Sequence, residues 1–247
     1  MANFLFEYKT LNYLEKGKGD LLIILPGNTA SSIAHQSQID ILSEYFHTVS
    51  LDYLGTGKSE RTQEIKDNWW KYASGQIDSL ISHLGYQKAN LAGTSGGAIV
   101  ALHAAANYPD KINRLILDSF SIRFSRDMFI KNVINTRKEI SPDQEGFWKF
   151  CHGEDWKEVI DWDTKNIERI VEQGGYWLEK CLDKIKCPTL LLGSESDEFL
   201  PNIKQEFETL SNQIPECHFV LTSIGNHPLM WTNTQFYIYE LKKFLKI

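Results

Sequence analysis

A serine between two glycines lies where a predicted strand gives way to a predicted helix. Gly93 and Gly97 flank Ser95 in the pattern Gly-x-Ser-x-Gly, between the predicted strand 89–93 and the alanine-rich predicted helix 96–108. Only small residues fit two positions before and two positions after a serine on so sharp a turn. The turn lifts the hydroxyl clear of the sheet and sets it at a helix amino terminus, where negative charge is favoured. Ser95 is therefore a candidate nucleophile.

A serine hydroxyl becomes nucleophilic when a base takes its proton, and His227 is the candidate base. His227 follows the last predicted strand, 218–221, and precedes the closing predicted helix, 234–244. Loops at the carboxyl ends of parallel strands converge on one edge of the sheet, so His227 can reach Ser95. The other histidines are expected on helices, at strand starts or in a helical insertion: His35, His47, His83, His103, His152 and His218.

The base needs a carboxylate to fix its tautomer and stabilise the imidazolium. Asp197 follows the predicted strand 189–192, which gives the chain order Ser, Asp, His. Asp118 is the alternative, because it ends the preceding predicted strand, 112–117. An aspartate in that place often just ends a strand and caps a turn.

Acyl chemistry also requires two N–H donors that hold a developing oxyanion. Gly96 directly follows Ser95 and supplies one backbone N–H. The second is expected from the loop after the predicted strand 21–25, where we assign it to the backbone N–H of Asn28.

The surrounding sequence alternates between strands and helices, which predicts an α/β fold with a mostly parallel, doubly wound sheet. Further strands are predicted over 4–8, 9–14 and 47–52, and further helices over 31–46, 68–84 and 202–213. The continuous apolar run Leu21–Leu25 is typical of a strand covered on both faces.

One long stretch, 121–185, shows helical periodicity and no strand pattern. We predict that it forms a helical cap, or lid, on a core made of 1–120 and 186–247, because large insertions in compact folds tend to be functional. The alternative is a helical hairpin that packs on the sheet for stability alone. The stretch holds the tryptophans Trp148, Trp156, Trp162 and Trp177.

These motifs together resemble the α/β-hydrolase superfamily, in its capped, esterase-like form, across essentially the whole chain. Pro26-Gly27-Asn28 is similar to the family's His-Gly-x oxyanion loop, with proline where histidine is common, and 52–59 is similar to its Asp-x-x-Gly-x-Gly-x-Ser loop. By the same resemblance Ser95 occupies the nucleophile elbow, His227 the histidine loop and Asp197 an Asp-x-x-x-Pro acid loop, which favours Asp197 over Asp118. Asn226 stands where the family often has glycine, and Gly96 where Met, Leu or Gln is frequent.

The resemblance implies an enzyme without a metal or an organic cofactor, acting on a small-molecule substrate. Ser95 argues against a haloalkane dehalogenase or an epoxide hydrolase, since those members of the family use an aspartate nucleophile. The expected reaction is cleavage of a small ester or related acyl compound through an acyl-enzyme on Ser95. Two alternatives stay open: a C–C bond hydrolase or lyase with the same triad, and a non-catalytic ligand-binding homologue.

Composition sets outer limits on the other functions. The 247 residues carry a formal net charge of -6 and no dense Lys/Arg cluster, which argues against a nucleic-acid partner. The sequence shows no signal peptide, and no apolar run approaches the length of roughly 18 residues that a membrane helix needs. We therefore expect a cytoplasmic protein without a membrane partner. The four cysteines form no Cys-x-x-Cys pair, which fits free thiols and no zinc site. The sequence does not predict the oligomeric state.

Overall fold

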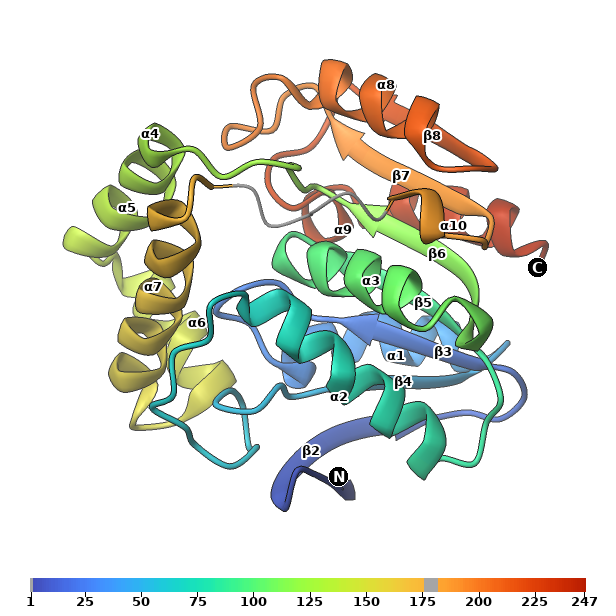
Figure 1. Ribbon diagram of the computed structural model, residues 1–247, viewed down its shortest axis with the longest axis horizontal. Helices are drawn as coiled ribbons and strands as arrows, with labels where there is room; N and C mark the ends of the chain where they lie inside the picture. Colours follow the sequence, from blue (N-terminus) through green and yellow to red (C-terminus); the bar gives the residue numbers. More distant parts are fainter. Residues whose placement is uncertain (1, 176–181) are drawn as a thin grey trace.

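The computed structural model describes residues 2–175 and 182–247, and within them one eight-stranded sheet carries helices on both faces (Figure 1). Trp177 and Cys181 lie outside the described residues. The strands are β1 (Ala2–Phe6), β2 (Lys9–Lys16), β3 (Leu21–Leu25), β4 (His47–Leu51), β5 (Ala89–Thr94), β6 (Ile112–Asp118), β7 (Thr189–Ser194) and β8 (Cys217–Thr222). The longer helices of the core are α1 (Gln36–Leu42), α2 (Trp69–His83), α3 (Gly96–Asn107), α8 (Ile203–Gln213) and α10 (Thr234–Leu245).

The strand order confirms the mostly parallel, doubly wound sheet. It runs β1-β2-β4-β3-β5-β6-β7-β8. The pairs β1–β2 and β2–β4 are antiparallel, and every pair from β4 to β8 is parallel. Because parallel neighbours all end at the same edge, the loops after β3, β5, β7 and β8 meet there.

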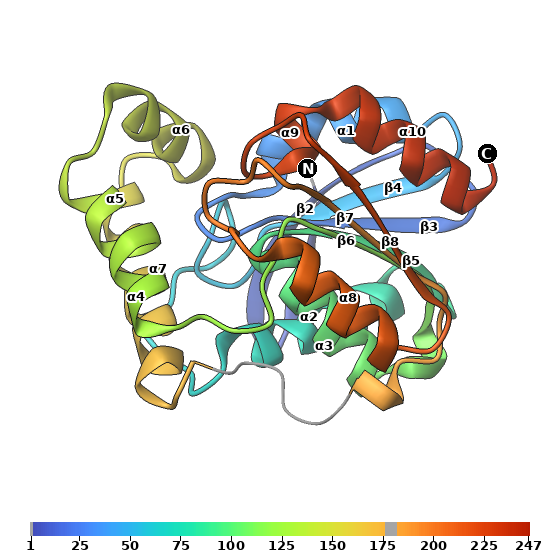
Figure 2. The same ribbon diagram turned by 90° about the horizontal axis from the view of Figure 1, so that it is seen from above.

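The apolar run of β3 is buried on both faces of the sheet, as its sequence predicts. All five side chains from Leu21 to Leu25 are buried. Ile23 packs in the core formed with α2, α3 and α8, whereas Leu22 and Ile24 pack in a second core with α1 and α10. The two helical layers lie on opposite sides of the sheet (Figure 2). Successive residues of a strand point to opposite faces, so a continuous apolar run is what a strand between two helical layers requires.

The helix predicted over 31–46 is shorter than expected. A 3-10 turn, η1 (Ser32–His35), leads into α1, which ends at Leu42. The chain must turn here because the N–H of His47 donates to the carbonyl of Asp20 at 3.0 Å, which starts β4 in register with β3.

Helices fill the described chain between β6 and β7. They are α4 (Arg126–Phe129), the π-helix η3 (Ile130–Ile134), α5 (Asn135–Lys138), α6 (Pro142–His152), α7 (Trp156–Glu172) and the short η4 (Leu182–Lys184). The helices α4 to α7 gather at one side of the molecule, apart from the two layers that cover the sheet (Figures 1 and 2). We call the segment 121–185 the helical insert.

Candidate active site

Ser95 sits on a strained turn between β5 and α3. Its φ of 53° and ψ of −123° lie in a region that residues with a side chain rarely adopt. A Cβ at Gly93 would lie 2.4 Å from the carbonyl oxygen of Gly97, and one at Gly97 would lie 2.1 Å from that of Leu25. The Ser95 N–H donates to the carbonyl of Asp118 at 2.8 Å, which anchors the turn to the neighbouring strand. Both glycines are thus required by the close approach of backbone to backbone.

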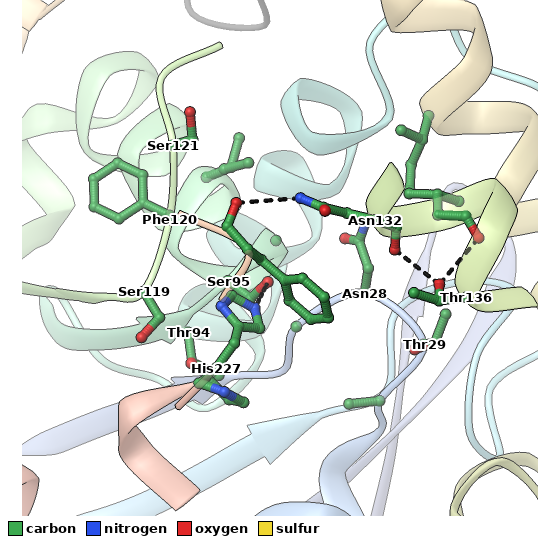
Figure 3. A pocket seen from close by; sticks show the side chains of 18 of the residues that line it. Asn28, Thr29, Thr94, Ser95, Ser119, Phe120, Ser121, Asn132, Thr136 and His227 are labelled. Carbon is green, nitrogen blue, oxygen red and sulfur yellow. Dashed lines mark hydrogen bonds between the residues drawn. The ribbon is translucent and has the colours of Figure 1, made fainter. Parts of the chain in front are cut away.

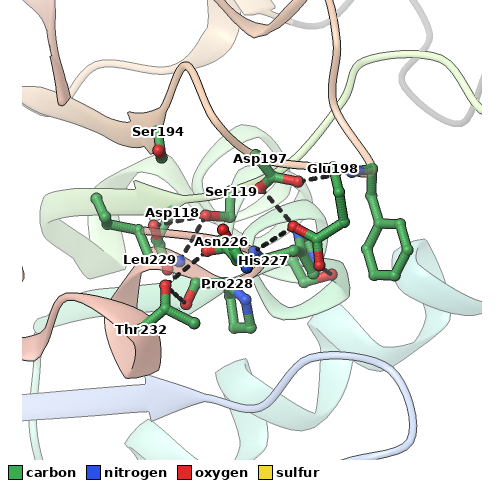
Figure 4. A network of polar contacts seen from close by, with 12 residues as sticks. Asp118, Ser119, Ser194, Asp197, Glu198, Asn226, His227, Pro228, Leu229 and Thr232 are labelled. Carbon is green, nitrogen blue, oxygen red and sulfur yellow. Dashed lines mark hydrogen bonds and ion pairs between the residues drawn. The ribbon is translucent and has the colours of Figure 1, made fainter. Parts of the chain in front are cut away.

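His227 lies between Ser95 and Asp197 in a continuous chain of hydrogen bonds; Figure 3 labels His227 with Ser95, and Figure 4 labels it with Asp197. Its Nε2 is 2.9 Å from Ser95 Oγ, and its Nδ1 is 2.9 Å from Asp197 Oδ2. The backbone N–H of His227 donates to Glu198 Oε2 at 3.1 Å, and the edge of the Phe199 ring packs on the imidazole with centroids 5.1 Å apart. These contacts fix the ring in one orientation, with one nitrogen toward the serine and the other toward the carboxylate.

Asp197 is held by the loop that follows β7. Its side chain is fully buried, and its second oxygen, Oδ1, accepts a hydrogen bond from the Phe199 N–H at 3.0 Å. Both carboxylate oxygens therefore have a donor, one from the imidazole and one from the backbone. The neighbouring Glu198 accepts the hydrogen bond from the backbone N–H of His227.

Asp118, the alternative acid, lies under the site without a hydrogen bond to His227. One oxygen accepts from Thr94 Oγ1 and the Met230 N–H, and the other accepts from Ser119 Oγ. Burial raises the pKa of this carboxyl to about 6, although the three hydrogen bonds act in the opposite direction. Asp118 joins β5, β6 and the short helix α9 (Leu229–Thr232), and so supports the loops that carry Ser95 and His227.

The loop after β3 lies against the serine. The Ala30 N–H donates to the Gly27 carbonyl at 3.2 Å, which closes a tight turn with Thr29 at a φ of 62°. A Cβ at Gly27 would lie 3.2 Å from the Cβ of Ser95. Within the part of the chain that the structure describes, the backbone N–H groups of Asn28 and Gly96 donate to no protein acceptor. Two amide donors thus adjoin Ser95 without a protein partner.

The glycine after the serine has a local explanation. The Asn28 carboxamide oxygen accepts a hydrogen bond from Trp70 Nε1 at 3.0 Å. A Cβ at Gly96 would lie 1.9 Å from that same oxygen and 3.1 Å from the Asn28 backbone nitrogen. The Asn28 side chain therefore fills the space that a larger residue at 96 would need, and the two backbone N–H groups come close together. Trp70, on α2, has no motif around it that pointed to this role.

A cavity of about 280 Å³ opens beside Ser95 and His227 (Figure 3). The sheet side contributes Ile99, Phe120, Phe199 and Leu200, among others, and the insert contributes a wall with both apolar and polar side chains. The insert residues at the wall are Ser121, Phe124, Asn132, Val133, Thr136, Arg137, Gln144, Phe147, Trp148 and Ile167. The site is thus a mainly aromatic and aliphatic chamber with a few polar groups opposite the serine.

The tryptophans of the insert have different positions. Trp148 lines the cavity, and Trp156 stacks on it with ring centroids 5.5 Å apart. Trp162 packs edge-on against Trp69 at 4.5 Å and donates from Nε1 to the Glu64 carbonyl. Trp148 is therefore the one of these three that can contact a ligand in the cavity.

The described residues also bear on metal binding, thiol chemistry and membrane insertion. No three His, Cys, Asp or Glu side chains of residues 2–175 and 182–247 are grouped so as to hold a metal ion. Burial raises the pKa values of the thiols of Cys151 and Cys187 to about 11 and that of Cys217 to about 12, so these thiols are protonated at neutral pH and weakly nucleophilic. Within the same residues, no helix has the length and apolar character needed to span a membrane.

The chain is similar in sequence to known proteins. The sequence profile of a family described as the alpha/beta hydrolase fold matches residues 20–143, which is half of the chain. A 2-(acetamidomethylene)succinate hydrolase of Mesorhizobium japonicum is 35% identical over 115 residues, which is 45% of this chain and 40% of the relative, so the match spans less than half of that protein. The human serine hydrolase BPHL is 26% identical over 235 residues, 89% of this chain and 77% of the relative.

Solved structures share the fold. The crystal structure of an enol-lactonase from Burkholderia xenovorans superimposes with a TM-score of 0.77 at 17% identity, covering 100% of both chains. At that identity the likeness concerns the fold alone, so the chemistry must be argued from the side chains around Ser95.

Proposed function

The chain belongs to the α/β-hydrolase fold family, and we propose that it is a serine hydrolase that cleaves a small ester or related acyl compound through an acyl-enzyme on Ser95. The observation that carries the proposal is the unbroken chain of contacts from Asp197 through His227 to Ser95, each 2.9 Å long. Its relatives support hydrolysis as the general reaction, and one of them is named a serine hydrolase.

The proposed reaction begins with proton transfer from Ser95 to His227. As Oγ attacks the substrate carbonyl, Nε2 accepts the hydroxyl proton, and the buried Asp197 carboxylate stabilises the imidazolium that forms. The carbonyl oxygen becomes an oxyanion beside the backbone N–H groups of Asn28 and Gly96, which have no protein acceptor recorded among the described residues. Donors that already point at the developing charge lower the barrier because they need no reorganisation.

The second half of the reaction repeats these steps with water. The imidazolium of His227 protonates the leaving group, which departs and leaves the acyl group on Ser95 Oγ. Water then gives a proton to Nε2 as it attacks the acyl carbonyl, and collapse of the second tetrahedral intermediate returns the proton to Ser95 and releases the acid. No cofactor takes part in this scheme.

The cavity suggests the size and character of the substrate. A volume of about 280 Å³ lined by aromatic and aliphatic side chains suits a short acyl or aryl group, with its carbonyl at Ser95. We propose that the insert, 121–185, acts as a cap on the core of 1–120 and 186–247, because Trp148 and Ile167 from α6 and α7 line the same cavity as Ser95.

The test combines covalent labelling with activity. A fluorophosphonate probe should label one residue of the protein, and mass spectrometry should identify it as Ser95. A screen of p-nitrophenyl esters from acetate to decanoate should show preference for short acyl chains, and Ser95→Ala should remove this activity. Labelling at another residue, or Ser95→Ala activity within about tenfold of the unchanged protein, would disprove the assignment. Labelled protein that cleaves no ester would direct the search to C–C bonds.

A further inference from the structure

His152, the last residue of α6, connects the helical insert to the loop that carries Asn28 (Figure 3 shows Asn28 and Thr29 beside Ser95). Its Nδ1 accepts a hydrogen bond from the Gly57 N–H at 3.0 Å, and its Nε2 is 3.0 Å from the Thr29 carbonyl oxygen. The side chain is buried. It thus bridges the loops after β3 and β4 from a helix more than ninety residues further along the chain.

The two partners determine the protonation of the ring. A backbone N–H can only donate, so Nδ1 must be unprotonated opposite Gly57. A carbonyl can only accept, so Nε2 must carry the proton and donate it to Thr29. Burial lowers the pKa of His152 to about 4, and the Arg61 charge acts in the same direction. The hydrogen bond to Thr29 and the charges of Asp52 and Asp155 oppose this shift but do not cancel it, so the ring is neutral at neutral pH.

Thr29 needs such an external contact. A β-branched residue at a φ of 62° is a strained conformer, and strain of this kind persists only where the surroundings hold it. Within the turn, the hydrogen bond from Ala30 to Gly27 is 3.2 Å long. Pro26, before the turn, has no polar side chain to add another contact. The donor on His152 is therefore the side-chain contact that fixes the Thr29 carbonyl.

Neighbouring contacts keep His152 in place. Arg61 donates to the His152 carbonyl at 2.9 Å and forms a two-pronged ion pair with Asp155, the residue that precedes α7. Ser31 Oγ donates to the Cys151 carbonyl at 2.9 Å. Two hydrogen bonds within the described residues thus attach the carboxyl end of α6 to the loop after β3, and of these the one from His152 reaches the turn that presents the Asn28 N–H.

We propose that His152 is a positioning residue for the oxyanion site, which holds the Gly27–Ala30 turn so that the Asn28 N–H points at the reacting carbonyl. The proposal rests on the proposed function, because an oxyanion forms only if Ser95 attacks a carbonyl. It makes the insert a part of the catalytic apparatus as well as a wall of the cavity: the donor from the loop after β3 is in position only when α6 is packed on that loop.

Two substitutions distinguish the acceptor role of Nδ1 from the donor role of Nε2. The carboxamide oxygen of His152→Asn can replace Nδ1 as acceptor for Gly57 but leaves no donor for Thr29. The longer His152→Gln can place its N–H₂ near Nε2 and retain the donor. Ser31→Ala is the matched control, since it removes the other hydrogen bond between this loop and α6 without touching the turn.

The expected losses appear in kcat. Outright removal of an oxyanion donor costs about 10²- to 10³-fold, and misplacing one costs less, so H152N should lower kcat by about 10- to 100-fold with KM within about threefold. H152Q should keep kcat within about fivefold, and S31A within about threefold. Inhibition by a trifluoromethyl ketone, whose adduct carries an oxyanion, should weaken in H152N by the same factor as kcat/KM.

The melting temperature of each variant shows whether it is folded, and Ser95→Ala tests the proposed function separately. If folded H152N keeps kcat within threefold, or if S31A or H152Q loses as much as H152N, the proposal is wrong. If H152N does not fold, the decision rests on H152Q, and a kcat loss above about tenfold in that folded variant overturns the proposal. Activity that survives Ser95→Ala would refute the proposed function itself, whereas an inactive Ser95→Ala with an unaffected H152N would refute only the role of His152.

Discussion

Replacing Asp197 by asparagine changes a single atom at the centre of the proposed triad, and the structure determines what the new amide can do. The carboxylate accepts two hydrogen bonds in a fully buried place: from His227 Nδ1 at 2.9 Å and from the Phe199 N–H at 3.0 Å. An amide has one accepting oxygen and one donating nitrogen, so it cannot satisfy both donors.

The amide has two orientations, and the unproductive one is favoured. With its oxygen toward His227, its NH₂ group opposes the Phe199 N–H, and two buried donors that face each other cost about 1–3 kcal/mol. With its oxygen toward Phe199, its NH₂ group donates to His227 Nδ1. That tautomer carries its proton on Nε2, which faces Ser95 Oγ at 2.9 Å and can no longer accept the serine proton.

The expected loss has two parts. The orientation preference of about 1–3 kcal/mol reduces the productive tautomer by about 5- to 150-fold. Loss of the negative charge beside the imidazolium adds to this, so that kcat for Asp197→Asn should fall by about 10³- to 10⁴-fold in total, or about 4–5.5 kcal/mol. KM should change little, because Asp197 does not line the cavity.

The assay is steady-state hydrolysis of p-nitrophenyl esters, with Asp118→Asn as the matched control. Asp118 is also buried and has three hydrogen bonds, but none joins it to His227. Asp118→Asn should lower the melting temperature and keep kcat within about tenfold. Near-normal kcat in Asp197→Asn, or a collapse of kcat in folded Asp118→Asn, would refute the reasoning and transfer the role of the acid to Asp118.

Three further outcomes follow from contacts in the structure. Gly97→Ala should abolish activity and lower the free energy of unfolding by more than about 2 kcal/mol, because its Cβ would lie 2.1 Å from a backbone oxygen. The control is Gly146→Ala, whose Cβ would have nothing within 4 Å and which should be neutral or stabilising in urea titrations. Because burial lowers the pKa of His152 from 6.5 to about 4, the unfolded chain binds this proton at higher pH than the folded one. The stability that neutral His152 gives is therefore present above pH 6.5 and lost towards pH 4. The difference in free energy of unfolding between the unchanged protein and H152N, measured by urea titration, should be about 3 kcal/mol smaller at pH 4 than at pH 7. A difference that does not change with pH would contradict this. Trp148→Ala should shift the ester preference toward longer acyl chains, while Trp156→Phe, behind it, should change the melting temperature and leave that preference unaltered.

Local patterns in the sequence were sufficient to predict the sheet and the sharp turn at Ser95. The apolar run of β3 predicts a strand buried on both faces because neighbouring side chains of a strand point in opposite directions. Gly93 and Gly97 predict the turn at Ser95 because backbone atoms approach there too closely for any side chain. Such requirements act over a few residues, so they are visible in a few residues of sequence. The end of α1 at Leu42 was not visible in this way, because it depends on the contact between His47 and Asp20.

The resemblance favoured Asp197 over Asp118 as the acid, but the contact that distinguishes the two is visible only in the tertiary structure. Asp118 and Asp197 both follow strands of the same sheet, and either position suits a buried carboxylate. What separates them is a hydrogen bond of 2.9 Å to His227, which only Asp197 makes. The packing of loops that lie far apart in the chain decides which carboxylate meets the imidazole, and the residues around Asp197 alone do not specify that packing.

Contacts between distant segments also explain why the sequence analysis did not predict the surroundings of the loop after β3. The sequence named Asn28 and Gly96, but the contact that excludes a side chain at 96 comes from the Asn28 carboxamide, held by Trp70 on another helix. Nothing in the sequence around His152 distinguished it from the other histidines that were given no role. Its proposed role depends on α6, which packs on the loop after β3 and brings the imidazole to the Thr29 carbonyl. Hydrogen bonds are short and directional, so their partners are determined by how distant segments pack against each other and cannot be found in either segment alone.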